Sequence, residues 1–189
     1  MAKKSTYNAK DIEVLEGLEP VRKRPGMYIG STNQDGLHHL VNEVLDNSID
    51  EVLAGHATDI SFQYKKDGSI KIKDNGRGIP IDFHPKYKNK RALEVVLTTL
   101  HAGGKFNSDA YKTSGGLHGV GISVVNALSS LLQVQVFKDG KVYRQDYSKG
   151  KVKTKIKIEK CSKKLKGTEI SFIPDENIFE ETLFVPVSY

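Results

Sequence analysis

The chain has 189 residues, of which 38% are hydrophobic and 28% are charged, and a formal net charge of +6. This length and composition are those of a single globular domain with a real hydrophobic core. No apolar run approaches the roughly 20 residues that a membrane-spanning helix needs, and no apolar stretch follows the basic start as in a secretory signal. The single Cys161 excludes an internal disulfide and favours a reducing compartment, so we expect a cytoplasmic protein.

The positive charge permits a nucleic-acid or nucleotide partner without specifying one. Nine lysines lie between residues 149 and 166, and four of them alternate along one expected strand. Such a run is typical of a solvated face on an edge strand. A nucleic-acid-binding patch, whose affinity would fall steeply with salt, is the alternative.

The first half of the chain predicts an arm followed by helices. Residues 1–10 are polar and aperiodic, which is typical of an N-terminal arm. Apolar residues at helical spacing between 12 and 18 predict a short helix that Pro20 ends. The same spacing recurs from Leu37 to Leu53 and predicts a long amphipathic helix that ends at Gly55.

The second half is richer in strands, which alternation and turn residues indicate. The expected elements are a hairpin of 60–64 with 70–72, a loop at 75–90, a helix at 93–100, a Gly-rich stretch at 103–121, a helix at 122–128, a hairpin around 134–142, and strands at 152–158 and 169–173. Helices come early and antiparallel hairpins come late. We therefore predict an α+β fold, a two-layer sandwich with helices on one face of a mixed, mostly antiparallel sheet.

The long helix carries an unusual polar stripe. His39, Glu43, Asn47 and Asp50 follow one another at offsets of four, four and three, so they share one face of the helix. Amide and carboxylate oxygens suit a Mg²⁺ ion that also holds phosphates, and a carboxylate there could take a proton from water. A generic helix with such a stripe more often presents it to solvent.

Two Gly-rich segments could form the rest of a site. Asp74–Pro80 follows a strand, and its glycines would let the backbone approach a ligand, although Asp, Asn and Gly also make ordinary turns. The glycines of 103–121 precede a helix, whose N-terminus would point several N–H groups at an anion such as a phosphate. No Walker A sequence closes this segment. Together, the helix stripe and these loops contain the parts of a nucleotide site.

Six motifs resemble, in order, those of one ATPase superfamily. Glu43–Glu51, Asp74–Pro80 and Gly115–Gly121 look like the successive boxes of the GHKL ATPases. The other three narrow the resemblance to the B subunits of bacterial type II DNA topoisomerases; they are Arg22–Gly30, Leu100–Phe106 and Ser123–Ser129. The resemblance implies the Bergerat (GHKL) fold over residues 11–175, with an ATP lid at about 101–121 and a tail at 176–189.

The resemblance implies ATP and Mg²⁺ as cofactors and assigns roles to particular residues. Glu43 would be the general base with His39 as its helper, and Asn47 would be the Mg²⁺ ligand. Asp74, aided by Thr168, would bind the adenine amino group, and Arg77 would pair with Glu51 below it. The other residues expected to contact the nucleotide are Tyr7 (from a partner subunit), Asp46, Gly78, Ile79, Pro80, Gly103, Gly104, Lys105, Leu117, His118, Gly119, Val120, Gly121 and Arg144, the last at the pocket mouth.

The implied activity is that of an ATP-hydrolysing DNA topoisomerase whose ATP-driven dimerisation powers DNA strand passage. The implied partners are a second B subunit, the topoisomerase A subunit, DNA, and aminocoumarin-type inhibitors. In this family a lysine from a transducer domain beyond the present sequence reaches the γ-phosphate. We therefore expect the 189-residue chain to bind ATP with little turnover and to bind DNA weakly.

Other members of the superfamily remain alternatives. Ser48, the Asp82–Tyr87 loop and Tyr111–Ser114 look more like topoisomerase IV than gyrase. Histidine kinases, heat-shock chaperones and mismatch-repair proteins share the Asn helix and glycine boxes, but should lack Arg22–Gly30 and Leu100–Phe106. A basic nucleic-acid-binding module without nucleotide chemistry is the most distant alternative.

Overall fold

The computed structural model describes residues 15–100 and 121–185. Its elements in chain order are α1 (Glu19–Lys23), α2 (Gly26–Ile29), α3 (Gln34–Leu53), β1 (Ile60–Tyr64), β2 (Ile70–Asp74), α4 (Ala92–Thr98), α5 (Ile122–Ala127), β3 (Ser129–Lys138), β4 (Lys141–Ser148), β5 (Lys151–Val152), β6 (Lys157–Lys160) and β7 (Gly167–Pro174).

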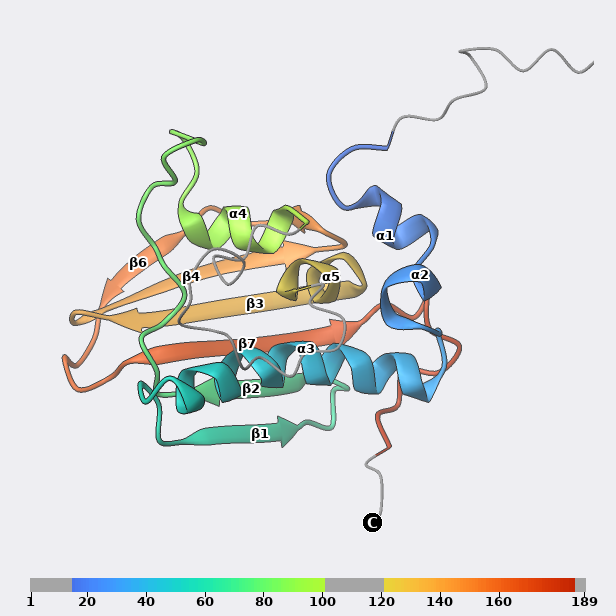
Figure 1. Ribbon diagram of the computed structural model, residues 1–189, viewed down its shortest axis with the longest axis horizontal. Helices are drawn as coiled ribbons and strands as arrows, with labels where there is room; N and C mark the ends of the chain where they lie inside the picture. Colours follow the sequence, from blue (N-terminus) through green and yellow to red (C-terminus); the bar gives the residue numbers. More distant parts are fainter. Residues whose placement is uncertain (1–14, 101–120, 186–189) are drawn as a thin grey trace, which may run out of the picture.

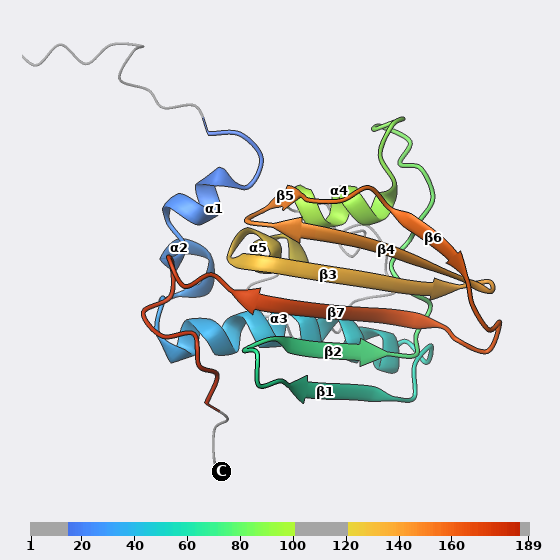
Figure 2. The same ribbon diagram turned by 180° about the vertical axis from the view of Figure 1, so that it is seen from behind.

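The strands form one sheet in the order β1-β2-β7-β3-β4-β5, and β6 also pairs with β4. Every pairing between the described strands is antiparallel. Helices α3, α4 and α5 lie over one face of the sheet (Figure 1), and the opposite face is seen uncovered from behind (Figure 2). The predicted two-layer α+β fold is confirmed.

Helix α3 is the longest element, at 20 residues, or about 30 Å of axis. Asn33 caps its N-terminus by accepting a 2.9 Å hydrogen bond from the backbone N–H of Asp35. Its apolar stripe, which includes Leu37, Leu40 and Val44, is buried in the main core. Neither α3 nor any other helix within the described ranges is both long and apolar enough to cross a membrane.

The core lies between the helices and the covered face of the sheet. Alternate residues of the central strands, such as Val134 and Val136 on β3 and Ile170 on β7, are fully or nearly fully buried there. Because side chains alternate across a strand, Gln135 and Glu169 point to the opposite face. That opposite face is largely polar, as expected for an antiparallel sheet covered on one side.

Two sequence predictions of local structure were wrong. Leu15 and Leu18 precede the first helix, which begins at Glu19 and contains Pro20 in its first turn, where a missing N–H costs nothing. The strand expected at 152–158 is interrupted by a bulge between β5, which ends at Val152, and β6, which begins at Lys157. Asp146 holds this bulge through its carbonyl, which accepts from the N–H groups of Lys153 and Thr154.

Candidate functional site

Asp74 is the last residue of β2 and is only 5% exposed. Ser48 on α3 donates its hydroxyl to Oδ2 at 2.8 Å. The backbone N–H groups of Gly76 and Thr168 donate to Oδ1 at 2.9 and 3.4 Å. A carboxylate has about four acceptor sites, so these three donors fix its orientation and still leave capacity for a ligand donor.

Gly167 brings Thr168 against Asp74. Its φ of +113° is in the region that favours glycine, and a Cβ there would collide with the backbone carbonyl of Asp74. The Thr168 hydroxyl in turn accepts a 3.1 Å hydrogen bond from the N–H of Ile79. This bond connects the loop after β2 to the start of β7. The loop, β7 and helix α3 therefore meet around the Asp74 carboxylate.

Glu51 and Arg77 form a close ion pair beside this loop. The Nη2 of Arg77 lies 2.7 Å from Oε1 of Glu51, while its Nε and backbone N–H both donate to Oε2. Burial works to raise the pKa of Glu51, but the hydrogen bonds from Arg77 outweigh it and hold that pKa below its ordinary value. Glu51 therefore stays charged and anchors the Asp74–Pro80 loop on the end of α3.

Glu43, two turns earlier on α3, faces the start of α5. Glu43 is 8% exposed, and its Oε2 accepts a 3.1 Å hydrogen bond from the backbone N–H of Gly121. Gly121 is the N-cap residue of α5. Ser48 and Glu43 are five residues apart, about 7.5 Å along the helix axis. One helix therefore contacts both the Asp74 loop and the end of the Gly-rich segment.

Asn47 lies between these two contacts and is half-buried. Its Nδ2 donates a 2.8 Å hydrogen bond to the backbone carbonyl of Glu43. Because the amide nitrogen is used in this way, Oδ1 is the atom that can receive a cation. His39 and Asp46 are also half-buried, and Asp50 is 7% exposed. The burial of Glu43 and Asp50 rules out a stripe that simply faces solvent.

Arg144, which the family resemblance puts at the pocket mouth, lies on β4. It pairs with Gln135 across β4 and β3, and its guanidinium contacts the side chains of Gln135 and Glu159. Thr168 instead pairs with the core residue Val136, so its side chain lies on the helix-covered face. Alternation along the strands puts Arg144 on the opposite face of the sheet, away from Asp74. The place of Arg144 at the pocket mouth stays a prediction.

Several predicted residues lie outside the described ranges. They are Tyr7, Gly103, Gly104, Lys105, Leu117, His118, Gly119 and Val120. The remaining predicted residues of the Asp74 loop lie next to β3 and β7. Gly78 has a φ of +82°, Ile79 bonds Thr168, and Pro80 follows them at an exposed position.

Sequence reasoning missed the contacts of two side chains. In the sequence Ser48 indicates only the subfamily, whereas in the structure it hydrogen-bonds Asp74 across 26 residues. Asn75 closes the base of the loop by accepting from the backbone N–H groups of Thr58 and Asp59. The position of Ser48, next to Asn47 on the buried side of α3, was a signal for the first contact. Nothing local in the sequence indicates the second.

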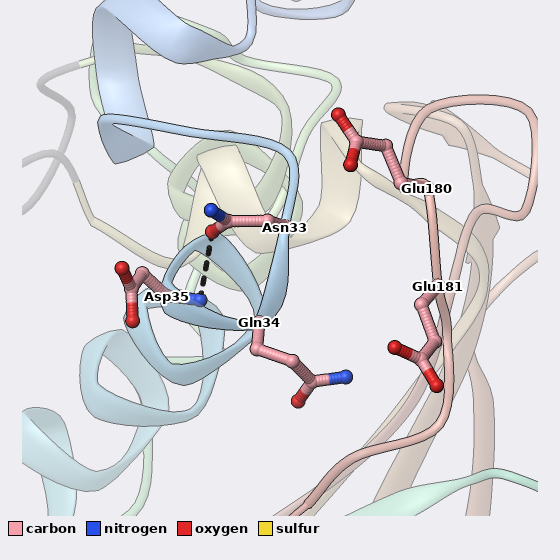
Figure 3. Close-up of a pocket in the computed structure, with 5 residues that line it drawn as sticks. All are labelled: Asn33, Gln34, Asp35, Glu180 and Glu181. Carbon is pink, nitrogen blue, oxygen red and sulfur yellow. Dashed lines mark hydrogen bonds between the residues drawn. The ribbon is translucent and has the colours of Figure 1, made fainter.

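A separate hollow lies at the N-terminus of α3 (Figure 3). It is lined by Asn33, Gln34, Asp35, Glu180 and Glu181. Three of these five side chains are carboxylates, so the hollow repels a nucleotide phosphate. It also lies about 21 Å along the α3 axis from Asn47. We do not include it in the candidate site.

Comparison with known proteins identifies the class of this fold and site. Residues 32–178 match the family described as histidine kinase-, DNA gyrase B- and HSP90-like ATPases. The match covers well over half of the chain. The chain therefore belongs to this ATPase family, and its two-layer architecture is the GHKL ATPase fold.

Within that family the chain is similar to parts of type II topoisomerases. It is 63% identical over 179 residues to the B subunit of DNA topoisomerase 4 from Rickettsia bellii, covering 95% of this chain and 27% of that protein. It is 59% identical over 180 residues to the B subunit of DNA gyrase from Thermotoga maritima, with 95% and 28% covered. The chain thus spans a little over a quarter of these curated relatives.

A solved structure supports the same assignment. The 43K ATPase domain of Thermus thermophilus gyrase B, in complex with an aminocoumarin, superposes with a TM-score of 0.77 at 44% identity. The superposition covers 89% of this chain and 42% of that one.

Proposed function

We propose that this chain is the ATP-binding domain of a type II DNA topoisomerase B subunit, of the topoisomerase IV kind. The observation that carries the proposal is the buried carboxylate of Asp74, held by donors from α3, the loop and β7. A buried, oriented acceptor suits the exocyclic amino group of adenine. A guanine, with a carbonyl at the equivalent position, would place an acceptor against this acceptor.

The phosphate end of the nucleotide would lie against the Glu43 end of the site. Mg²⁺, when bound, would neutralise phosphate charge, and Asn47 Oδ1 is the oxygen that would hold it. Glu43 would accept the proton of the attacking water, with His39 assisting, while the N–H of Gly121 keeps the carboxylate oriented. The segment 103–121, with its glycines and Lys105, would wrap the phosphates as a lid. Residues Asp46, Gly78, Ile79 and Pro80 would line the pocket.

The further parts of the activity are proposed for a whole B subunit, since the chain spans a little over a quarter of its curated relatives. ATP would close a dimer of B subunits, with Tyr7 reaching into the partner's site, and the closure would drive DNA strand passage together with the A subunit. The setting would be the cytoplasm. A lysine from the following domain would complete the γ-phosphate site, so the 189-residue chain should bind ATP and release phosphate only slowly. Aminocoumarin inhibitors, which bind the gyrase B relative, should compete with ATP here.

A nucleotide-dependent thermal shift tests the proposal. Mg²⁺ with a non-hydrolysable ATP analogue at 100 times its Kd should stabilise the native chain by about 2.7 kcal/mol, or roughly 5 °C or more. Asp74→Asn should abolish this gain, because the amide turns a donor toward the adenine amino group. Asp67→Asn, in the exposed β1–β2 turn, is the matched control and should keep the gain. A native chain whose melting temperature ignores the analogue contradicts the proposal.

The choice of topoisomerase IV over gyrase is supported by the higher identity to the Rickettsia relative, 63% against 59%. The test uses the complete B subunit with its A subunit. Decatenation of linked circles without supercoiling of relaxed DNA is expected. ATP-dependent supercoiling would assign the chain to gyrase instead.

A further inference from the structure

The positive charge of the chain is concentrated in one segment. Residues 149–166 contain nine lysines and one glutamate, which gives them a formal charge of +8, whereas the whole chain carries +6. The other residues are therefore slightly acidic in total. Each of the nine lysines is exposed. A charge asymmetry of this size marks a candidate surface for an anionic partner.

This lysine segment runs along one edge of the sheet. β5 and β6 both pair with the outer side of β4, at the edge opposite β1. Between them Thr154 is fixed, since its hydroxyl accepts from the N–H of Asp146 and its carbonyl accepts from the Gln145 side chain. The backbone of the segment is therefore held in place while its lysines project into solvent.

A second basic segment adjoins this edge. The loop of residues 82–91 is closed by a bridge between Phe83 and Arg91, and its Lys86, Lys88 and Lys90 are exposed. The Arg91 guanidinium lies 4.5 Å from the Phe83 ring centre and 5.8 Å from that of Tyr143. Tyr143 is the β4 residue that pairs with Ile158 of β6. Both views show the loop rising at the end of the sheet where β6 lies (Figures 1 and 2).

We propose that the lysine edge, defined as residues 149–166 together with the 82–91 loop, binds the phosphate backbone of duplex DNA without reading its sequence. Five of the nine lysines occupy every second position from 149 to 157. Successive phosphates of one DNA strand lie roughly 3.4 Å apart along the helix axis, so a row of lysines of this length faces several phosphates. Flexible ammonium groups at this spacing can each reach a phosphate, whereas they offer no planar match to a base edge.

Protection of a sheet edge explains only part of this charge. Lysines on an edge strand prevent unwanted strand pairing. Lys163, Lys164 and Lys166, however, follow β6 in a turn, and the lysines of the 82–91 loop belong to no strand of the sheet. Because these lysines lie outside the edge strands, prevention of strand pairing does not explain them. They extend the positive surface of the lysine edge.

The inference rests on the proposed function for the choice of DNA as the polyanion. Contact through the lysine edge would let the ATPase domain hold a DNA duplex while its nucleotide site opens and closes. The two sites are separate, because the lysine edge lies at β4–β6 and the nucleotide site at α3, β2 and the start of β7. Experiment can therefore refute DNA binding by the lysine edge without refuting nucleotide binding, and the reverse.

The test measures fluorescence anisotropy of a labelled 30-bp duplex titrated with the full chain at several salt concentrations. We expect weak binding that is equal for unrelated sequences and that falls steeply with salt. Lys155→Gln/Lys157→Gln should weaken it at least fivefold and reduce the slope of log K against log salt by up to about 1.8, or about 0.9 per lost phosphate contact. Lys163→Gln/Lys164→Gln, in the turn after β6, should weaken binding in the same way as Lys155→Gln/Lys157→Gln. It serves as the second test variant if the first one folds poorly.

Lys65→Gln/Lys66→Gln is the matched control. It removes the same charge from the exposed β1–β2 turn at the other edge of the sheet, and should change the affinity less than twofold. Equal losses in control and test variants would mean that net charge alone attracts DNA, and would overturn the inference. Binding of polyglutamate but not of the duplex would also overturn it and would indicate an acidic protein partner.

The thermal shift with the ATP analogue separates this inference from the proposed function. A native chain that responds to nucleotide but binds no duplex refutes the lysine edge alone. A chain that binds the duplex through these lysines and ignores nucleotide refutes the proposed function alone.

Discussion

At the scale of single residues, the loop after β2 depends on a glycine for two distinct reasons. Gly78 has a φ of +82°, which side chains other than glycine rarely adopt. A Cβ at this position would also lie 2.8 Å from Cγ1 of the core residue Val136. Gly68, in the β1–β2 turn, has the same φ but no heavy atom within 4 Å of the added Cβ. A comparison of substitutions at Gly78 and Gly68 therefore separates the free-energy cost of backbone strain from that of a packing clash.

We predict that Gly78→Ala destabilises the fold more than Gly68→Ala does. The shared conformational cost should be about 1–2 kcal/mol. The clash with Val136 should add about 1–3 kcal/mol in Gly78→Ala only. Urea unfolding of both variants measures the difference. Equal free energies of unfolding would show that the loop moves away from the sheet, in which case nucleotide binding should suffer instead.

At the scale of elements, α3 also fixes the segment that leaves the domain. The Gln34 amide donates to the carbonyl of Leu183 at 2.6 Å and accepts from the N–H of Val185 at 3.2 Å. His38 approaches the Val185 carbonyl at 2.9 Å, and its ring lies edge-on to Phe184 with 5.1 Å between ring centres. Helix α3 therefore contains the candidate catalytic residues in its middle and contacts residues 183–185 near its N-terminus.

Gln34→Ala should release this outgoing segment without unfolding the domain. Loss of two backbone contacts worth about 1.4 kcal/mol together would speed amide exchange of residues 183–185 about tenfold. Hydrogen exchange read by mass spectrometry gives the result, and amides of β7 serve as an internal reference. Gln63→Ala on the edge strand β1 is the control, with no expected change. Unaltered exchange in Gln34→Ala would show that the packing of Phe184 suffices.

At the scale of the whole molecule, one ion pair joins distant ends of the chain. Arg22 on α1 lies 2.9 Å from Asp175, which follows β7 and is only 1% exposed, and also donates to the carbonyl of Ala127. Burial works to raise the pKa of Asp175, but hydrogen bonds from the Asn177 N–H and from Arg22 hold it below its ordinary value. The charged form of Asp175 therefore stabilises the fold.

This contribution is present above the ordinary pKa of an aspartate, about 3.9, and is lost as the pH falls through the lower pKa of the folded state. Asp175→Asn should accordingly cost about 1–3 kcal/mol at pH 7, and the difference from the native chain should shrink below about pH 4. Urea unfolding across this pH range measures it. The exposed neighbour gives a control, since Glu176→Gln should stay within about 0.5 kcal/mol. A difference that is independent of pH would contradict the role of the charge.

The sequence by itself determined the helix stripe, the strand-forming segments and the order of the glycine motifs. These are local properties: helical spacing puts Glu43 and Asn47 on one face, and alternation with turn residues defines each hairpin. The layered architecture followed from the order of these elements. Family resemblance alone supplied the role proposed for Thr168, which no spacing rule gives.

The tertiary structure alone decided which side chains meet and which face each one occupies. Ser48 and Asp74 are 26 residues apart, so only the packing of α3 on β2 brings them into contact. The face that Arg144 occupies depends on its register with β3, which the local sequence does not specify. The broken edge strand has the same cause, because its bulge depends on hydrogen bonds to β4 across the sheet.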